Sequence, residues 1–408
     1  MAKKLPIGIV LSGTAPAMTL MSGAMLAFDK CNVEFDVIST TGVGGLIGML
    51  YLAPKGKSRE QALRELPNLF VSDWLYRVVP INFKVFHKYS PFATSAYNFR
   101  KRISNSLPFR IGPEDSNEIK RFDNDWIELW ATALTPASHR FTSKGFMSHV
   151  PFVEDLVDFA RLKKSETRFY LNAFSLTKRR LRIFNNHDVE KTECWTDYYN
   201  GAQAMYMLFP PVRTDDDLLM TGATCDPTGL QAIWTTDERE KLTGVLALDP
   251  LTECFWRIPT DTYDAFQLML MNPIVHLQQL IYALYARTDM LVNGPPGGSG
   301  PSTARVRLPR LFSIKAEIPE AHRPKILKWT HENAMILQKA GYDAALPIAR
   351  QLSDTALTDA ALQEALSPRR FGESVLRTQP RSQQFLSRPF GPMFEPSERY
   401  GRYFDDLG

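Results

Sequence analysis

The order of apolar and small-residue segments predicts an α/β protein with a mostly parallel central sheet flanked by helices. Two observations favour this fold class. The first 52 residues run strand, loop, helix, strand, turn, helix, and later apolar strands again alternate with helical segments. Ligands of such sheets bind beyond the carboxyl ends of the strands. We therefore expect the functional site at the loops that follow the first two strands.

The first strand is expected over residues 7–11, a short apolar run with β-branched side chains. A loop of small residues follows over 12–17. Residues 19–29 then predict a helix whose small side chains, Gly23 among them, lie on the face toward the sheet.

The stretch from residue 35 to residue 50 is the most informative part of the sequence. An apolar strand over 35–39 runs into the turn Thr40-Thr41-Gly42-Val43-Gly44, and a helix follows to about residue 52. Strand, tight turn and helix in this order build the nucleophile elbow of serine hydrolases. The central residue of such a turn is strained and needs small neighbours. That central residue is Gly42, so the frame of an elbow is present without a nucleophile.

Residues 55–165 form an aromatic-rich section that we interpret as a largely helical insertion covering the sheet. Helices are expected over 58–69 and 123–132, the second with Trp126 and Trp130 at helical spacing. Buried aromatic side chains dominate protein cores, so these are expected mainly in the insertion's own core. Lining an apolar pocket is the alternative.

The remaining elements complete the predicted sheet and its helical layers. A hairpin is expected over 168–184, and a helix over 197–208 ends before two prolines. The other expected strands are 218–220, 242–248 and 311–318, and the other expected helices are 261–291 and 320–346.

Two charged runs each allow a functional and a structural interpretation. The basic run from Lys178 to Arg182 suits a phosphate, but a solvated hairpin tip is the favoured interpretation. Three adjacent carboxylates, Asp215, Asp216 and Asp217, suit a metal ion. No second cluster of ligands lies nearby in sequence, so a solvated acidic turn is favoured.

Residues 1–350 are expected to form one α/β domain, and residues 351–408 a C-terminal arm. From residue 367 onward the arm is rich in Arg, Pro, Phe and Tyr and has little periodicity. Its repeated aromatic residues favour packing on this subunit or on a neighbour, and disorder is the alternative. The arm is therefore a candidate element for a protein partner or a homodimer.

Composition excludes several classes of function. The net charge of +4 is small for 408 residues, so no nucleic acid partner is expected. No apolar run reaches the length of a membrane span, although peripheral membrane contact remains compatible with the sequence. The four cysteines are scattered, as in a cytoplasmic protein with reduced thiols. The seven histidines show no metal-ligand spacing, so neither a metal nor a cofactor is expected.

Six or seven segments in order resemble the patatin-like phospholipase family. They are the first strand and loop through Gly13, the elbow around Gly42, the hairpin, the run Phe209-Pro210-Pro211-Val212, the turn Thr221-Gly222-Ala223, and the helix around Gly341. The resemblance spans roughly residues 5–348. It implies the three-layer α/β fold of that family and a lipid acyl hydrolase that uses a Ser–Asp dyad.

The same resemblance shows where this chain departs from the family. Gly42 stands where the family has its serine, and Thr221 stands where it has its aspartate. The oxyanion loop lacks the family's basic residue and contains Pro16, which has no backbone N–H to donate. Because three features change together, hydrolysis of the family's kind is not expected.

Other side chains near the elbow are candidates for a relocated site. Thr41, Cys225 and Asp226 are the candidates, although each would need a partner to act as a nucleophile or base. Ligand contacts are expected from both special loops, at Ser12, Gly13, Thr14, Thr41, Gly42, Val43 and Gly44.

Two functions follow from these expectations. The first is a pseudoenzyme that binds a lipid or acyl ligand, or a partner protein, without hydrolysing it. The alternative is a repurposed enzyme that acts on an acyl, ester or other apolar substrate with relocated catalytic residues. A hydroxyl or thiol within about 2.6–3.2 Å of a base at the pocket would favour the alternative.

Overall fold

A computed structural model describes most of the chain. The described residues are 6–13, 17–106, 118–134, 144–189, 194–214, 216–248, 252–255, 257–293 and 308–353. The expected C-terminal arm therefore lies almost entirely outside the described residues.

An eight-stranded sheet forms the centre of the molecule, in the order β10-β9-β1-β2-β5-β8-β7, with β6 paired to β5. The pairs among β10, β9, β1, β2 and β5 are parallel, and β6, β7 and β8 add antiparallel pairs. This confirms the mostly parallel sheet. The strands are β1 (Ile7–Leu11), β2 (Val37–Thr41), β5 (Arg168–Ser175), β6 (Arg180–Asn185), β7 (Val212–Arg213), β8 (Leu218–Thr221), β9 (Gly244–Leu248) and β10 (Arg310–Ile314).

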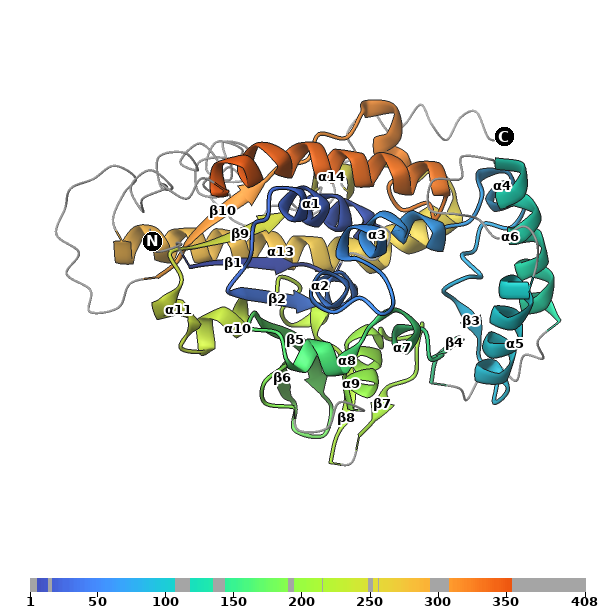
Figure 1. The fold of residues 1–408 in the computed structure, drawn as a ribbon, viewed down its shortest axis with the longest axis horizontal. Helices are drawn as coiled ribbons and strands as arrows, with labels where there is room; N and C mark the ends of the chain where they lie inside the picture. Colours follow the sequence, from blue (N-terminus) through green and yellow to red (C-terminus); the bar gives the residue numbers. More distant parts are fainter. Residues whose placement is uncertain are drawn as a thin grey trace, which may run out of the picture.

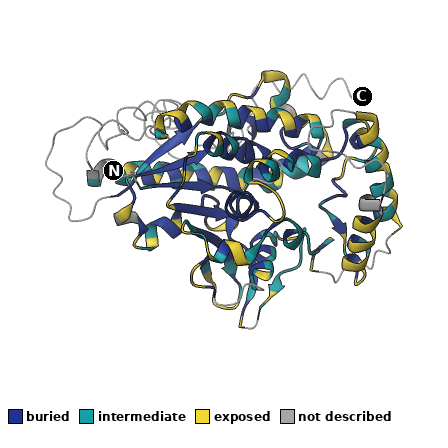
Figure 2. Ribbon diagram, in the orientation of Figure 1, coloured by how far each residue is buried: buried dark blue, intermediate teal, exposed yellow. Residues whose placement is uncertain are grey.

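Helices cover both faces of the sheet and give three layers (Figure 1). Side chains such as Ile9 pack with α1 (Met18–Lys30), α2 (Gly44–Leu52) and α14 (His331–Leu352). Val10, the next residue along β1, packs with α10 (Leu230–Thr235) and α13 (Thr262–Asn293). Successive strand residues point to opposite faces, so both faces of this sheet are apolar. Figure 2 shows the same centre as the most deeply buried part of the protein.

The remaining helices and a second, two-stranded sheet complete the described structure. The other helices are α3 (Arg59–Arg64), α4 (Asp73–Val78), α5 (Ala93–Ser106), α6 (Glu118–Ala133), α7 (Val153–Leu156), α8 (Phe159–Lys163), α9 (Cys194–Gln203), α11 (Glu238–Lys241) and α12 (Thr252–Phe255), and β3 (His87–Lys88) pairs with β4 (Met147–Ser148). Of the helices in the described ranges, none has the length and apolar character to cross a bilayer.

Glycines allow α1 and α14 to touch backbone to backbone. A Cβ on Gly23 would lie 1.8 Å from the carbonyl oxygen of Gln338, and a Cβ on Gly341 would lie 1.9 Å from that of Leu20. Both distances are impossible for a real side chain, so the two helices approach only because these positions are glycine. The amide of Gln338 also donates to Ser22 Oγ across the contact, at 3.0 Å.

The predicted helix over 320–346 is wrong at its start. Residues Glu320–Lys325 form a short 3₁₀ turn, and α14 begins only at His331. Thr330 caps this helix, because its side chain accepts a hydrogen bond from the backbone N–H of Asn333. Pro324 disfavours an α-helix in the earlier segment, since proline has no backbone N–H to donate.

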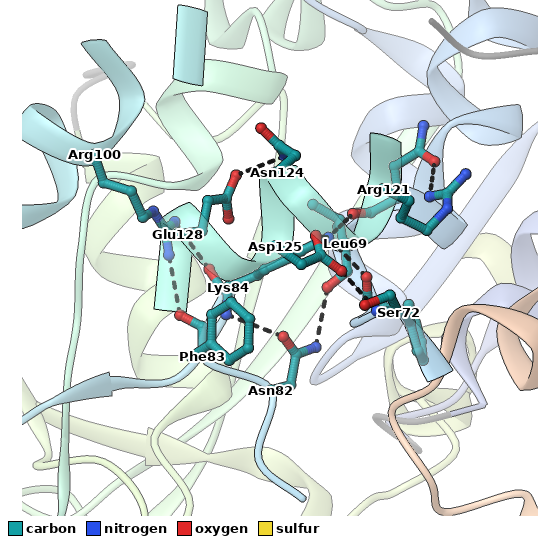
Figure 3. A network of polar contacts seen from close by, with 12 residues as sticks. Leu69, Ser72, Asn82, Phe83, Lys84, Arg100, Arg121, Asn124, Asp125 and Glu128 are labelled. Atoms are coloured by element: carbon teal, nitrogen blue, oxygen red, sulfur yellow. Dashed lines mark hydrogen bonds and ion pairs between the residues drawn. The ribbon is translucent and has the colours of Figure 1, made fainter. Parts of the chain in front are cut away.

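Helices α4, α5 and α6 of the insertion lie beyond the end of the sheet, whereas α3 packs on α1 and α2. In Figure 1, α4, α5 and α6 stand to one side of the three layers, with β3 and β4 between them and the sheet. The base of the insertion is a polar network, drawn in Figure 3. Lys84 Nζ lies 2.5 Å from Asp125 Oδ1, and both side chains are buried. Lys84 also donates to the carbonyl oxygen of Phe70, so the ion pair links α6 to the segment that follows the 3₁₀ turn Leu66–Leu69.

Helix α6 turns two charged side chains inward and its tryptophans outward. Arg121 and Asp125 are buried, whereas Trp126 and Trp130 are 42% and 52% exposed. The expectation that these two tryptophans belong to the insertion's core is therefore wrong. The i, i+4 spacing of Arg121 and Asp125 puts both on the face toward the domain, and the polar network needs them there.

Candidate functional site

The turn after β2 has the geometry of an elbow. Gly42 has a positive φ of 52°, a conformation that residues with a Cβ rarely adopt. A Cβ on Gly44 would lie 2.2 Å from the carbonyl oxygen of Leu11, so α2 begins in direct contact with the end of β1. The positive φ at Gly42 and the close contact at Gly44 explain why both residues are glycine. They also place the elbow against the loop that follows β1.

Three loops meet at this point of the sheet. A Cβ on Gly42 would lie 3.2 Å from Gly13 Cα, and one on Gly13 would lie 3.6 Å from Ala223 Cβ. Strand register explains the third loop: Thr41 pairs with Asn172 of β5, and the adjacent Ala173 pairs with Thr221. The ends of β1, β2 and β8 therefore converge.

A cavity of about 150 Å³ opens where these loops meet. Its wall is mostly apolar, and the insertion and α13 contribute to it together with the elbow. The lining residues are Gly13, Met18, Gly42, Val43, Leu46, Leu69, Val85, Phe86, Ser148, His149, Val150, Phe152, Tyr199, Asn200, Ala202, Gln203, Met205, Leu208, Phe209, Thr221, Ala223, Met271, Ile274 and Trp329. Gly42 and Thr221 thus face the same space.

The cavity includes some of the residues predicted to contact a ligand. Gly13, Gly42 and Val43 line it, whereas Ser12, Thr41 and Gly44 lie outside its wall. Thr14 falls outside the described residues. Ligand contacts at these positions stay predictions.

Thr221 and Thr41 have structural surroundings. The Thr221 side chain accepts a hydrogen bond from the Ala223 N–H at 3.2 Å, which caps the 3₁₀ turn Gly222–Thr224. Thr41 is fully buried, and its Oγ1 has no hydrogen-bond partner in the described structure. Neither hydroxyl is paired with a base among the described residues.

Asp226 is a capping residue for α10. Its Oδ1 accepts hydrogen bonds from the backbone N–H groups of Thr228 and Gly229, and its Oδ2 accepts one from Gln231. The Thr228 hydroxyl also donates to Oδ1, at 2.5 Å. Both oxygens of the Asp226 carboxylate are therefore already hydrogen-bonded to nearby backbone N–H groups. Cys225, the adjacent residue, is exposed and lies outside the cavity wall.

His149 and Gln203 are polar residues of the cavity that the sequence did not single out. His149 Nε2 lies 3.0 Å from the carbonyl oxygen of Pro210, and its ring stacks on Phe209 with 4.9 Å between centroids. Burial lowers the pKa of His149, although the hydrogen bond to Pro210 acts in the opposite direction. Gln203 Nε2 is buried without a partner in the described structure. In the sequence, the run Phe209-Pro210 marks this part of the cavity wall. The sequence does not indicate that His149 would contact it.

The two charged runs contact each other. Lys178 Nζ lies 2.6 Å from Asp216 Oδ2, and Arg182 Nη1 lies 3.0 Å from Asp217 Oδ2. Asp217 is buried and also accepts from Ser175 Oγ at 2.6 Å. The solvated-turn interpretation is wrong for Asp217, because the hairpin supplies its partners. Within the described ranges, no group of three potential metal-ligating side chains comes together.

Comparison with known structures gives distant similarities. VipD from Legionella pneumophila is 12% identical with a TM-score of 0.33, and the match covers 82% of this chain and 66% of VipD. Human GIVD cytosolic phospholipase A2 is 13% identical with a TM-score of 0.36, and the match covers 90% of this chain and 60% of that protein. The chain thus spans about two thirds or less of either protein. No curated protein sequence matches it.

Comparison with protein families gives a direct result. The family described as Patatin-like phospholipase matches residues 9–234, more than half of the chain. The matched segment begins in β1, includes the elbow at Gly42 and the turn at Thr221, and ends in α10. The chain belongs to the patatin-like phospholipase family.

Proposed function

We propose that this chain is a non-hydrolytic patatin-like protein that binds a small acyl or other apolar ligand in the cavity beside Gly42. The observation that carries the proposal is the mostly apolar lining of this cavity. An apolar cavity lies beside Gly42 and Thr221, the positions that by resemblance correspond to the family's serine and aspartate, and Gly42 contributes no side chain to it. Largely apolar pockets with a few polar groups are the usual form of small-molecule sites.

The chemistry at the elbow supports binding without hydrolysis. An acyl-enzyme of the family's kind needs an oxygen nucleophile at position 42, and glycine has none. Loss of the nucleophile or of a catalytic partner alone reduces kcat by roughly 10⁴- to 10⁶-fold in well-studied serine hydrolases. Thr221 cannot replace an aspartate as a base, and its hydroxyl already caps a turn.

The size of the cavity limits the ligand. A dry cavity of comparable volume, about 150 Å³, accommodates a molecule such as benzene in an engineered protein. The cavity here has the same volume, so it accommodates a group of about six carbon atoms. A longer lipid would need to extend beyond it.

One observation favours the alternative of a repurposed enzyme. His149 is a histidine within the wall of the cavity, and its lowered pKa keeps the imidazole neutral near pH 7, as a general base requires. In the described structure His149 contacts no hydroxyl or thiol nucleophile, so binding remains the better-supported function.

An assay with nitrophenyl esters of short and medium chains, and with a phospholipid, tests the proposal. We expect wild-type protein to bind a hexanoyl ester in a calorimetric titration and to release no nitrophenol above background. The comparison proteins are a Cys225→Ala variant and a double variant with Gly42→Ser and Thr221→Asp. A gain of hydrolysis in the double variant would show that the cavity accepts acyl substrates.

Ester hydrolysis by wild-type protein would contradict the non-hydrolytic proposal. If the Cys225→Ala variant then lost this hydrolysis, the Cys225 thiol would be the group that carries it out. The double variant needs a folding check, because Cβ at position 42 would lie 3.2 Å from Gly13 Cα.

A further inference from the structure

Helix α6 has an apolar stripe on the side that faces solvent. Ile119, Trp126, Trp130 and Leu134 follow one another at intervals of seven, four and four residues, so they share one face of the helix. All four are exposed, from 42% for Trp126 to 77% for Leu134. The Trp126 ring contacts Trp130 on one side and stacks on Phe122 on the other, with 6.0 Å between centroids in each pair. These rings therefore form one continuous surface.

Packing within the domain does not explain why this stripe faces outward. The opposite face of α6 carries Arg121 and Asp125, both buried, and Asp125 forms its ion pair with Lys84 there. A buried ion pair is often no more stabilising than apolar side chains packed in the same place. Turning the tryptophans inward would have removed their apolar area from water. The helix instead leaves its largest apolar side chains available to something outside the domain.

The two neighbouring helices expose apolar side chains as well. Both α4 and α5 contact α6, and Figure 2 shows exposed residues along all three helices. Large exposed apolar surface is uncommon on a monomer and marks a site of interaction. None of these side chains lines the cavity beside Gly42, so the surface is separate from that site. The exposed apolar residues are Trp74 and Val78 of α4, Phe99 of α5, and Phe92 just before α5.

The exposed charges of the same segments are mostly positive. Residues 73–106 and 118–134 expose five cationic side chains and two anionic ones, Glu118 and Asp123. The Arg77 guanidinium lies over the Trp74 ring, 5.9 Å from its centroid. Lys88 Nζ donates to the carbonyl oxygen of Ala133 at 3.1 Å, which places this cation at the end of α6. The five cations are Arg77, Lys88, Lys101, Arg102 and Lys120.

We infer that the insertion face, defined as the exposed side chains of α4, α5 and α6, docks on a bilayer that contains anionic lipid. Tryptophan is favoured where hydrocarbon meets headgroups, and an amphipathic helix at that depth buries its apolar face in the acyl boundary. Nearby lysine and arginine side chains attract anionic headgroups. The insertion face combines both properties, and this role is additional to ligand binding in the cavity.

Binding to vesicles tests the inference. One set of vesicles is made of phosphatidylcholine alone, and the other contains about one third phosphatidylglycerol. Co-sedimentation gives the partition coefficient of the full chain for each set. We expect wild-type protein to bind the anionic vesicles roughly tenfold more tightly than the neutral ones. A higher salt concentration should reduce this preference, because it screens the charges.

Variants assign the binding to the insertion face. Trp126→Gln combined with Trp130→Gln should weaken binding to both sets of vesicles at least about tenfold, because two large side chains no longer enter the acyl boundary. The matched control combines Leu280→Gln with Leu284→Gln, which have the same spacing on α13 and are 49% and 63% exposed. This control should bind as wild type does. Arg77→Gln should weaken binding to the anionic vesicles about fivefold and leave binding to the neutral ones nearly unchanged.

Fluorescence of wild-type protein gives a second readout that does not depend on a variant. Trp74, Trp126 and Trp130 are exposed, whereas Trp195 and Trp329 are buried. Vesicles whose acyl chains carry bromine should therefore quench part of the tryptophan emission of wild-type protein. Unquenched emission would overturn the inference even if the double tryptophan variant failed to fold.

The remaining outcomes separate a bilayer from other occupants of the insertion face. Absence of vesicle binding by wild-type protein would overturn the inference, as would undiminished binding by the double tryptophan variant. Equal affinity for neutral and anionic vesicles would overturn the role of the cations. A dimer in sedimentation velocity that the double tryptophan variant lacks, without vesicle binding by wild-type protein, would assign the face to a second copy of the chain. None of these results bears on the ligand proposed for the cavity.

Discussion

The elbow after β2 and the base of the insertion are both buried, but different contacts stabilise them. At the elbow, backbones touch because Gly42 and Gly44 have no side chains, and the hydroxyls nearby bond to the backbone or are enclosed. At the base of the insertion, the ion pair of Lys84 and Asp125 and the guanidinium of Arg100 fill the space between segments (Figure 3).

The comparison teaches that the two regions should respond to different changes. Steric contacts at the elbow are insensitive to pH and intolerant of one added carbon atom. A buried ion pair depends on both partners and on the protonation of its neighbours. The cavity lies where the two regions meet, since Gly42 of the elbow lines it together with Leu69, Phe86 and His149 of the insertion.

The largest expected effect comes from removing one charge at the base of the insertion. Asp125→Ala would leave Lys84 buried without its partner, which destabilises a protein by about 3–5 kcal/mol in comparable cases. Urea unfolding measures the change in the free energy of unfolding. Hydrogen exchange should show that amides of residues 73–106 and 118–134 lose protection first.

Two controls accompany this variant. Asp123→Ala removes an exposed carboxylate from the same helix and should change stability by less than about 0.5 kcal/mol. A double variant with Lys84→Met and Asp125→Leu should recover most of the loss, because no unpaired charge remains. If Asp125→Ala were as stable as Asp123→Ala, the ion pair would not anchor the insertion.

At the elbow, Gly44→Ala should destabilise the protein by about 3 kcal/mol. The added Cβ would meet the carbonyl oxygen of Leu11 at 2.2 Å, and backbone atoms cannot move aside as a flexible side chain does. Thermal unfolding measures the effect. Gly56→Ala is the control: its φ is also positive, at 67°, but no heavy atom lies within 4 Å of the added Cβ. Equal losses in the two variants would argue against steric contact at the elbow.

A smaller effect, about 2 kcal/mol for each histidine, is expected from lowering the pH from 7.5 to 5.0. Burial and the charge of Arg100 lower the pKa of His87 to about 3. Burial and the charges of Arg121 and Lys84 lower that of His331 to about 3. Below pH 6.5 protons therefore bind these histidines more readily in the unfolded chain than in the folded one. The free energy of unfolding has its full value above the unfolded pKa near 6.5 and decreases as the pH falls below it.

Urea unfolding at several pH values measures this slope. His87→Phe should make the slope shallower, whereas His187→Phe, a change at an exposed histidine, should leave it as it is. As the pH is lowered, the amides of the insertion should lose protection from hydrogen exchange before the amides of α2 do. An unchanged free energy of unfolding between pH 7.5 and 5.0 would contradict the comparison.

Local pattern was enough to predict most of the sheet and the elbow. Strand β1 is a continuous apolar run and β2 begins as one, and the glycines that follow β2 are required by contacts with the loop after β1 or with the end of that strand. The family resemblance then located the turn at Thr221. Each of these features is determined by residues close together in the sequence, or by one pairing of strands.

Contacts between distant segments could not be predicted. The hydrogen bond from His149 to Pro210 and the pairs between the hairpin and Asp216 and Asp217 join separate parts of the chain. Hydrophobic pattern also misplaced Trp126 and Trp130, because the inward face of α6 serves a polar network. Such arrangements follow from tertiary structure, which no single segment encodes.

The glycine contact between α1 and α14 has a consequence for biosynthesis. Gly23 emerges from the ribosome early, but the helix that covers it, which contains Gly341, is among the last described segments to be made. At about 5–20 residues per second, α1 waits for roughly 15 to 65 s before its partner helix exists. During that interval the face of α1 that packs on α14 is uncovered, and such exposed apolar surface is what chaperones bind.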